Sequence, residues 1–93
     1  MEIPASLLMT SGIHAYVVVK ASLQSTNSLV FGLSKVETDA LVKKFDNFKE
    51  EVMNGCLIRG SPIQVVNALA ELGYRVVGTT GDAEVVFTMQ RDI

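Results

Sequence analysis

Residues 61–77 read SPIQVVNALAELGYRVV, and this stretch decides the fold class because it carries a complete helix-to-strand unit. Ser61 is a good N-cap, Pro62 suits the first helical position, and Gln64 has the spacing of a capping box. A run of apolar residues then predicts a helix: Ile63, Val66, Ala68, Leu69 and Leu72. Gly73 stands where a helix commonly ends in a left-handed conformation, and residues 74–77 predict a strand.

The residues on either side of this unit predict further strands. Thr80-Gly81-Asp82 is typical of a turn, and residues 84–89 form an apolar return strand, so we expect a C-terminal hairpin. Upstream, residues 56–59 are a short strand candidate. The helix is therefore embedded among strands that follow one another closely in the chain.

The N-terminal third consists of short apolar runs. Residues 5–10 suit a strand, and Ser11-Gly12 suits a bend after it. Residues 13–19 are rich in β-branched and aromatic side chains and predict a well-buried strand. Residues 29–31 fit either another short strand or a packed loop.

A second capping box, Ser34-Lys35-Val36-Glu37, opens the central segment. Apolar residues then recur at steps of four, three and four: Leu41, Phe45, Phe48 and Val52. This spacing predicts one face of a helix, and Asn54-Gly55 is a suitable stop. We therefore expect one helix from about Lys35 to Met53.

These elements predict a single α+β domain over residues 1–93, with a small, mostly antiparallel sheet and two helices. Hydrophobic residues make up 48% of the chain. A chain this short buries only about 60–65% of its unfolded surface, so apolar surface should remain outside. Because such patches usually mark interfaces, we expect a homo-oligomer.

Charge and cysteine content exclude several function classes. The net charge is −2 and no basic patch is present, which argues against nucleic acid as a partner. No apolar stretch approaches the roughly 18–20 residues that span a bilayer, and the N-terminus does not resemble a signal peptide. The single cysteine, Cys56, indicates a reducing compartment. We therefore expect a cytoplasmic protein.

The residues that could perform chemistry form no recognisable constellation. His14 is the only histidine and lies in an apolar segment without an acidic neighbour, so a structural role is favoured over that of a catalytic base. Cys56 has no partner ligands at zinc-site spacing and fits a buried thiol. Asp46, Glu50 and Glu51 fit the solvated face of the central helix. We expect no catalytic residue, metal site or cofactor.

Polar residues gather at the expected hairpin tip: Thr79, Thr80, Asp82 and Glu84. Turn chemistry explains them, and contact with a ligand or partner explains them equally well.

Four segments are similar in order and spacing to the GTP cyclohydrolase I feedback regulatory protein family. They are the helix start at residues 61–69, the Gly-Tyr-Arg-Val-Val strand start at 73–77, Thr80-Gly81, and the apolar strand at 85–87. Residues 7–13 resemble the family's opening strand and bend. The resemblance covers about a third of the chain plus this N-terminal match.

The resemblance implies a cyclic homopentamer of small α+β subunits that caps GTP cyclohydrolase I without catalysing a reaction. It implies stimulation in the presence of L-phenylalanine and inhibition in the presence of tetrahydrobiopterin. The effector-contacting positions carried over from the family are Ile13 and Glu84, with Gly81 and Asp82 as neighbours.

Three departures from the family pattern leave alternatives open. The segment at residues 52–60 is longer here, and the counterpart of residues 45–52 is a strand in the family, a structure that Phe48, Glu50 and Val52 also fit. Glu84 stands where the family has Gln, which leaves the identity of the effector open.

The competing hypotheses are an oligomeric amino-acid-sensing domain for another enzyme, and a small enzyme whose acids and His14 converge on assembly.

Overall fold

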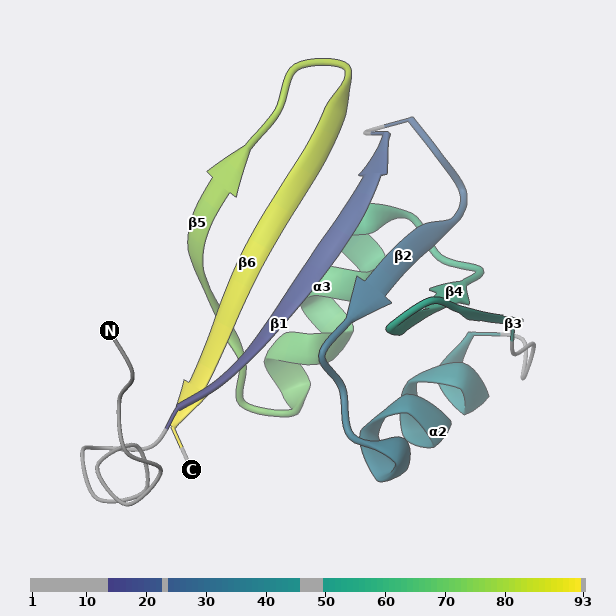
Figure 1. Ribbon diagram of the computed structural model, residues 1–93, viewed down its shortest axis with the longest axis vertical. Coiled ribbons are helices and arrows are strands. Elements are labelled where there is room, and N and C mark those ends of the chain that lie inside the picture. The colour runs from purple at the N-terminus through teal and green to yellow at the C-terminus, as the bar shows by residue number, and fades with distance from the viewer. Residues whose placement is uncertain (1–13, 23, 46–49, 93) are drawn as a thin grey trace.

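The computed structural model describes residues 14–22, 24–45 and 50–92, which form one sheet and two helices (Figure 1). The strands are β1 (His14–Ser22), β2 (Ser28–Phe31), β3 (Glu50–Val52), β4 (Gly55–Ile58), β5 (Arg75–Thr80) and β6 (Glu84–Asp92). The helices are α2 (Lys35–Lys44) and α3 (Pro62–Glu71). The strand order is β3-β4-β2-β1-β6-β5, and every neighbouring pair is antiparallel. The predicted α+β class is confirmed.

Both capping boxes form as predicted. The Ser34 hydroxyl accepts from the Glu37 amide at 3.3 Å, and the Ser61 hydroxyl accepts from the Gln64 amide at 3.3 Å. In return, the Ser34 amide donates to Glu37 Oε1 at 3.3 Å and the Ser61 amide donates to Gln64 Oε1 at 3.0 Å. These local contacts satisfy amides that have no partner inside the helix, so they fix where each helix begins.

The expectation of one helix from Lys35 to Met53 is wrong, because α2 ends at Lys44. Phe45 leaves the helical conformation, with φ −117° and ψ 79°. The Phe45 ring packs against Gly60, which has no side chain in the way. A Cβ atom on Gly60 would lie only 2.7 Å from that ring. Farther along, residues 50–52 pair with β4 as β3, so backbone pairing at the sheet edge replaces the helical periodicity.

The C-terminal hairpin is confirmed. Gly73, with φ +95°, follows α3 and turns the chain into β5, and β5 pairs antiparallel with β6. The register shifts between Val76 and Gly78, so β5 contains a bulge. The buried strand expected at residues 13–19 corresponds to β1, and residues 29–31 are a strand, not a packed loop. The strand expected at residues 5–10 lies outside the described residues.

The core lies between the helices and one face of the sheet. Figure 1 shows α3 lying across the sheet, where it packs on β1 and β5, while α2 packs on β4. Side chains along each strand alternate between this face and the opposite one. Those on this face form one buried cluster with apolar residues of both helices and Tyr74: Val17, Val19, Val30, Leu41, Val42, Cys56, Ile58, Val65, Ala68, Leu69, Tyr74 and Met89. The expectation that Cys56 is a buried thiol is confirmed.

The opposite face of the sheet carries a second apolar group. Because side chains alternate along a strand, Val18 points away from its buried neighbours Val17 and Val19. The strand register places further half-buried side chains beside it on that face: Leu29, Phe31, Leu57 and Val86. We call these five residues the helix-free face. Within the described part of the chain, no helix or strand covers it.

Candidate functional site

Three of the four predicted effector residues meet at the tip of the β5–β6 hairpin. Gly81 and Asp82 form the turn, and Glu84 is the first residue of β6, opposite Ser22 of β1. All three are exposed. The fourth residue, Ile13, lies outside the described residues. The tip therefore presents one acidic turn residue and one acidic strand residue to solvent.

Glu84 is balanced by a cation on the neighbouring strand. Lys20 Nζ lies 3.3 Å from Glu84 Oε1, and their side chains are 44% and 57% exposed. Lys20 is opposite Val86 in the register, so the pair is a diagonal one on the same face of the sheet. Solvent screens such a pair strongly, so its contribution to stability is small.

Gly81 is required by the geometry of the turn. Its φ is +115°, a conformation that side-chain-bearing residues rarely adopt. A Cβ at this position would overlap the backbone carbonyl oxygen of Glu84. Turn geometry is therefore sufficient to explain Gly81, whereas it places no such demand on Asp82 or Glu84.

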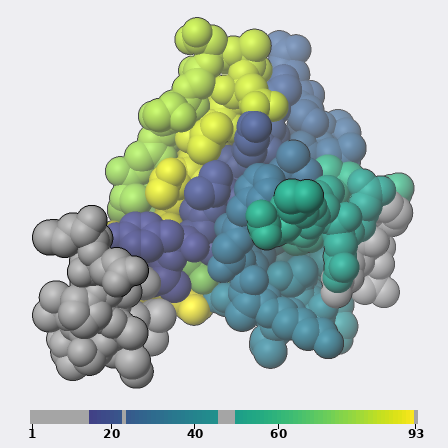
Figure 2. Space-filling view, in the orientation of Figure 1, coloured from purple at the N-terminus to yellow at the C-terminus, as the bar shows by residue number. Residues whose placement is uncertain are grey.

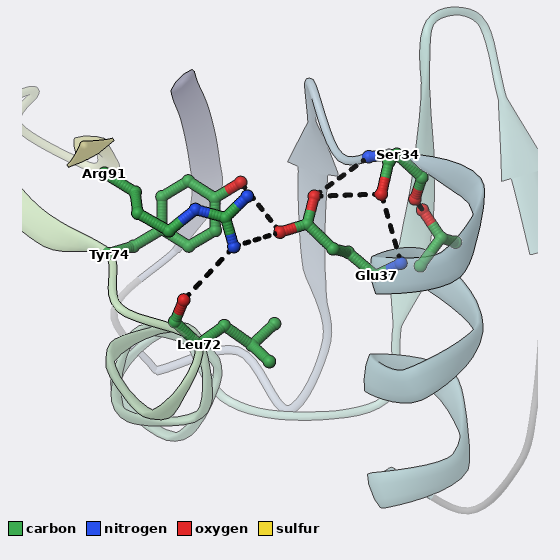
Figure 3. Close-up of polar contacts among 6 residues, drawn as sticks. Ser34, Glu37, Leu72, Tyr74 and Arg91 are labelled. Atoms are coloured by element: carbon green, nitrogen blue, oxygen red, sulfur yellow. Dashed lines mark hydrogen bonds and ion pairs between the residues drawn. The ribbon is translucent and has the colours of Figure 1, made fainter. Parts of the chain in front are cut away.

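A polar cluster of Ser34, Glu37, Tyr74 and Arg91 joins three elements on the helical side of the molecule (Figure 3). Glu37 Oε1 accepts from the Ser34 hydroxyl at 3.0 Å. Glu37 Oε2 accepts from the Tyr74 hydroxyl at 3.0 Å and lies 2.7 Å from Arg91 Nη1. We call these four residues the Glu37 cluster.

Arg91 extends the cluster to the end of α3. Its guanidinium donates to the Leu72 carbonyl oxygen at 3.2 Å and lies 4.6 Å from the centre of the Tyr74 ring (Figure 3). One side chain therefore pairs with a carboxylate, stacks on an aromatic ring and satisfies a carbonyl left free at a helix C-terminus. The start of α2, the end of α3 and the end of β6 are held together at this point.

The surroundings of Glu37 shift two pKa values. Burial alone raises the pKa of Glu37, but the hydrogen bonds from Ser34 and Tyr74 and the charge of Arg91 hold that pKa below its usual value. Burial raises the pKa of Tyr74, and its hydrogen bond to Glu37 adds to the rise. Glu37 is therefore ionised and Tyr74 neutral near pH 7, a state that fits a structural cluster better than a proton-transfer site.

The Glu37 cluster was not foreseen as a unit. The capping box identified Ser34 and Glu37 as a local pair, and Tyr74 was expected only as a strand residue. Arg91 was not singled out, because nothing in the local sequence links it to Glu37. Such a link depends on the sheet register, which brings the end of β6 beside the start of β5.

The acidic residues expected on the central helix are placed differently. Glu50 and Glu51 belong to β3, so the expectation that they lie on a helix face is wrong. Asp46 lies outside the described residues. The backbone of His14 opens β1 opposite Asp92. Within residues 14–22, 24–45 and 50–92, no three acidic, histidine or cysteine side chains gather as metal ligands.

A cavity of about 480 Å³ opens between the start of α2 and the β3–β4 hairpin. Charged residues of both signs line it, Lys35 from the helix and Glu51 from the strand. Its other polar groups come from Thr38 and Asn54, and its apolar floor includes Val30. The cavity lies at the β3 end of the sheet, away from the hairpin tip beside β5.

No known family model, curated protein or solved structure matches this chain. No helix in the described ranges is long and apolar enough to cross a membrane. The likeness to the cyclohydrolase regulators therefore remains a prediction from sequence.

Proposed function

We propose that this chain is a non-enzymatic regulatory subunit that assembles with its own copies and docks onto GTP cyclohydrolase I. In this proposal, L-phenylalanine favours a stimulatory complex and tetrahydrobiopterin favours an inhibitory one. The four sequence segments similar to the cyclohydrolase regulators suggest the partner and the effectors. The surface of the sheet supplies the physical argument for docking.

The observation that carries the proposal is the exposed edge strand β5. All six of its residues are exposed, and the large side chains of Val76 and Val77 are 42% and 48% exposed. β5 pairs only with β6 in the described sheet, so its other edge presents backbone groups without a strand partner. Such an edge is a template for pairing with another chain.

The helix-free face adds apolar area next to this edge. Figure 2 views the molecule from a side on which β5, β6 and β1 lie next to one another at the surface. Val86 of β6 and Val18 of β1 are half-buried there. Half-buried apolar side chains near an unpaired edge fit an interface better than a fully solvated sheet.

A ring is the assembly that these surfaces favour. The two ends of the sheet differ, because β5 is a six-residue strand with two exposed valines and β3 is a three-residue strand with two exposed glutamates. Contacts between unlike surfaces are heterologous, and they form closed rings when the rotation between subunits closes. We propose the cyclic homopentamer that the family resemblance implies.

The effector would lie where the hairpin tip meets the partner. Gly81, Asp82 and Glu84 project there, and Lys20 adds a cation beside Glu84. An effector held between two proteins stabilises whichever complex binds it more tightly, so regulation needs no reactive group in this chain.

Calorimetry with purified GTP cyclohydrolase I tests the proposal. We expect binding of the wild-type chain that tightens in the presence of phenylalanine. Val77→Lys should weaken assembly and docking, because it places a charge on the β5 edge. Val36→Lys is the matched control, because it places the same charge at a 79% exposed valine that lies on α2 and not on the β5 edge. Absence of wild-type binding with either effector would contradict the proposed partner.

A further inference from the structure

A three-residue turn connects α3 to the β5 edge. It consists of Leu72, Gly73 and Tyr74, and β5 begins at the next residue. The Gly73 amide donates to the Ala70 carbonyl oxygen at 3.0 Å, which ties the turn to the last residues of α3. Because the turn comes directly before β5, its conformation sets the direction in which the edge strand leaves the helix.

Arg91 holds this turn from the neighbouring strand β6. Its guanidinium donates to the Leu72 carbonyl oxygen at 3.2 Å and lies 4.6 Å from the centre of the Tyr74 ring (Figure 3). A Cβ at Gly73 would lie 3.2 Å from Arg91 Cδ, so the aliphatic part of Arg91 lies against the glycine. Arg91 therefore contacts all three residues of the turn.

Glu37 fixes the orientation of Arg91. Arg91 Nη1 lies 2.7 Å from Glu37 Oε2, which also accepts from the Tyr74 hydroxyl at 3.0 Å. The Arg91 and Glu37 side chains are 31% and 14% exposed, so solvent screens this ion pair less than it screens fully exposed charges. The turn before β5 is thus held between β6 and the start of α2.

β5 has few other restraints in the described structure. It pairs with β6 on one side, and in the described sheet no strand pairs with it on the other. Its register with β6 shifts between Val76 and Gly78, and all six of its residues are exposed, so no side chain of β5 is buried in the core. The contacts of the preceding turn therefore contribute much of the restraint on the direction of this strand.

We propose that Arg91 is a positioning residue for self-assembly, because it fixes the orientation of the β5 edge that another copy would meet. This inference rests on the proposed assembly through β5 and adds the residue that orients this edge. Heterologous contacts close into a ring only when the rotation between subunits fits. A change in the direction of β5 would therefore change which assemblies can form, even in a folded subunit.

Arg91→Lys tests the proposal in the full chain. Lysine keeps a positive charge for Glu37, but its single ammonium group cannot also donate to the Leu72 carbonyl oxygen and stack flat on the Tyr74 ring. We expect an unchanged far-UV circular dichroism spectrum and a several-fold rise in the concentration at which the oligomer is half dissociated, measured by light scattering. Glu37→Gln removes the carboxylate that orients Arg91 and should shift this midpoint in the same direction.

Two controls separate positioning from a general loss of stability. Arg59→Lys makes the same substitution at an exposed residue that directly follows β4. Ile58→Val removes a methyl group from a fully buried side chain on β4 and so lowers stability, while three strands lie between β4 and β5 in the sheet. Both controls should leave the dissociation midpoint at the wild-type value.

Amide hydrogen exchange gives a second readout, on the strand itself. The β5 amides should exchange faster in Arg91→Lys than in Ile58→Val, because loss of the anchor lets the edge open locally. An oligomeric wild type, with the same midpoint and the same β5 exchange in Arg91→Lys and in the controls, would overturn the positioning role alone. A monomeric wild type would overturn the proposed self-assembly and, with it, this inference.

Discussion

The tip of the β5–β6 hairpin and the Glu37 cluster both join separate parts of the chain, but they do so over very different sequence distances. At the tip, the backbones of Gly81 and Glu84 lie close together within a single turn, and the surrounding residues are exposed. In the Glu37 cluster, Glu37 and Tyr74 are 37 residues apart, and Tyr74 is 3% exposed. The Glu37 cluster therefore holds distant parts of the fold together, whereas the residues at the tip stay at the surface.

Removing the Glu37 carboxylate should have the largest effect on stability. Glu37→Ala leaves Arg91 without its carboxylate and the Tyr74 hydroxyl without its acceptor, and the Glu37 side chain is only 14% exposed. We expect a loss of about 2–3 kcal/mol in the free energy of unfolding, measured with urea. Glu71→Ala is the control, because its ion pair with Lys44 is exposed and should contribute less than about 1 kcal/mol. Equal losses would show that the cluster has no special role.

Substitution of Gly81 should have the next largest effect. Gly81→Ala combines an unfavourable positive φ with overlap against the Glu84 carbonyl, so we expect a loss of about 1–2 kcal/mol. Gly78→Ala is the matched control, because a Cβ there meets no atom within 4 Å. Thermal unfolding of both variants measures the difference. A Gly81→Ala protein as stable as Gly78→Ala would contradict the described turn.

Acidification should weaken the Glu37 cluster through the lowered pKa of Glu37. A carboxylate whose folded pKa lies below its usual value of 4.5 stabilises the fold above that pH and loses this contribution as the pH falls through the folded pKa. Urea unfolding between pH 3 and pH 7 should therefore show a smaller decline in stability for Glu37→Gln than for the wild type below about pH 4.5. Parallel curves for the two proteins would rule out this contribution.

Glu84 should have the smallest effect on stability and a separate effect on docking. Its ion pair with Lys20 is exposed, so Glu84→Ala should change unfolding by less than about 0.5 kcal/mol. In the docking proposal, the same change weakens phenylalanine-dependent association with the cyclohydrolase several-fold, as measured by calorimetry. Glu71→Ala again serves as the control. Unchanged association would remove Glu84 from the proposed effector contact.

Features set by neighbours in sequence could be predicted, and those set by long-range pairing could not. Both capping boxes, the stop at Gly73 and the C-terminal hairpin follow from local residue types. The predicted central helix is too long because Val52 fits both a helical and a strand period, and only the pairing of β3 with β4 decides between them. The cavity was missed for the same reason, since Glu51 faces it only in the strand register.

The proposed docking depends most directly on self-association through the exposed sheet. Light scattering coupled to gel filtration measures the mass of the purified chain, whose subunit mass is 10.1 kDa. We predict a single species of about five subunits that persists on dilution, and a shift toward smaller species for Val77→Lys but not for Val36→Lys. A stable wild-type monomer across the same concentrations would contradict self-association and the docking that depends on it.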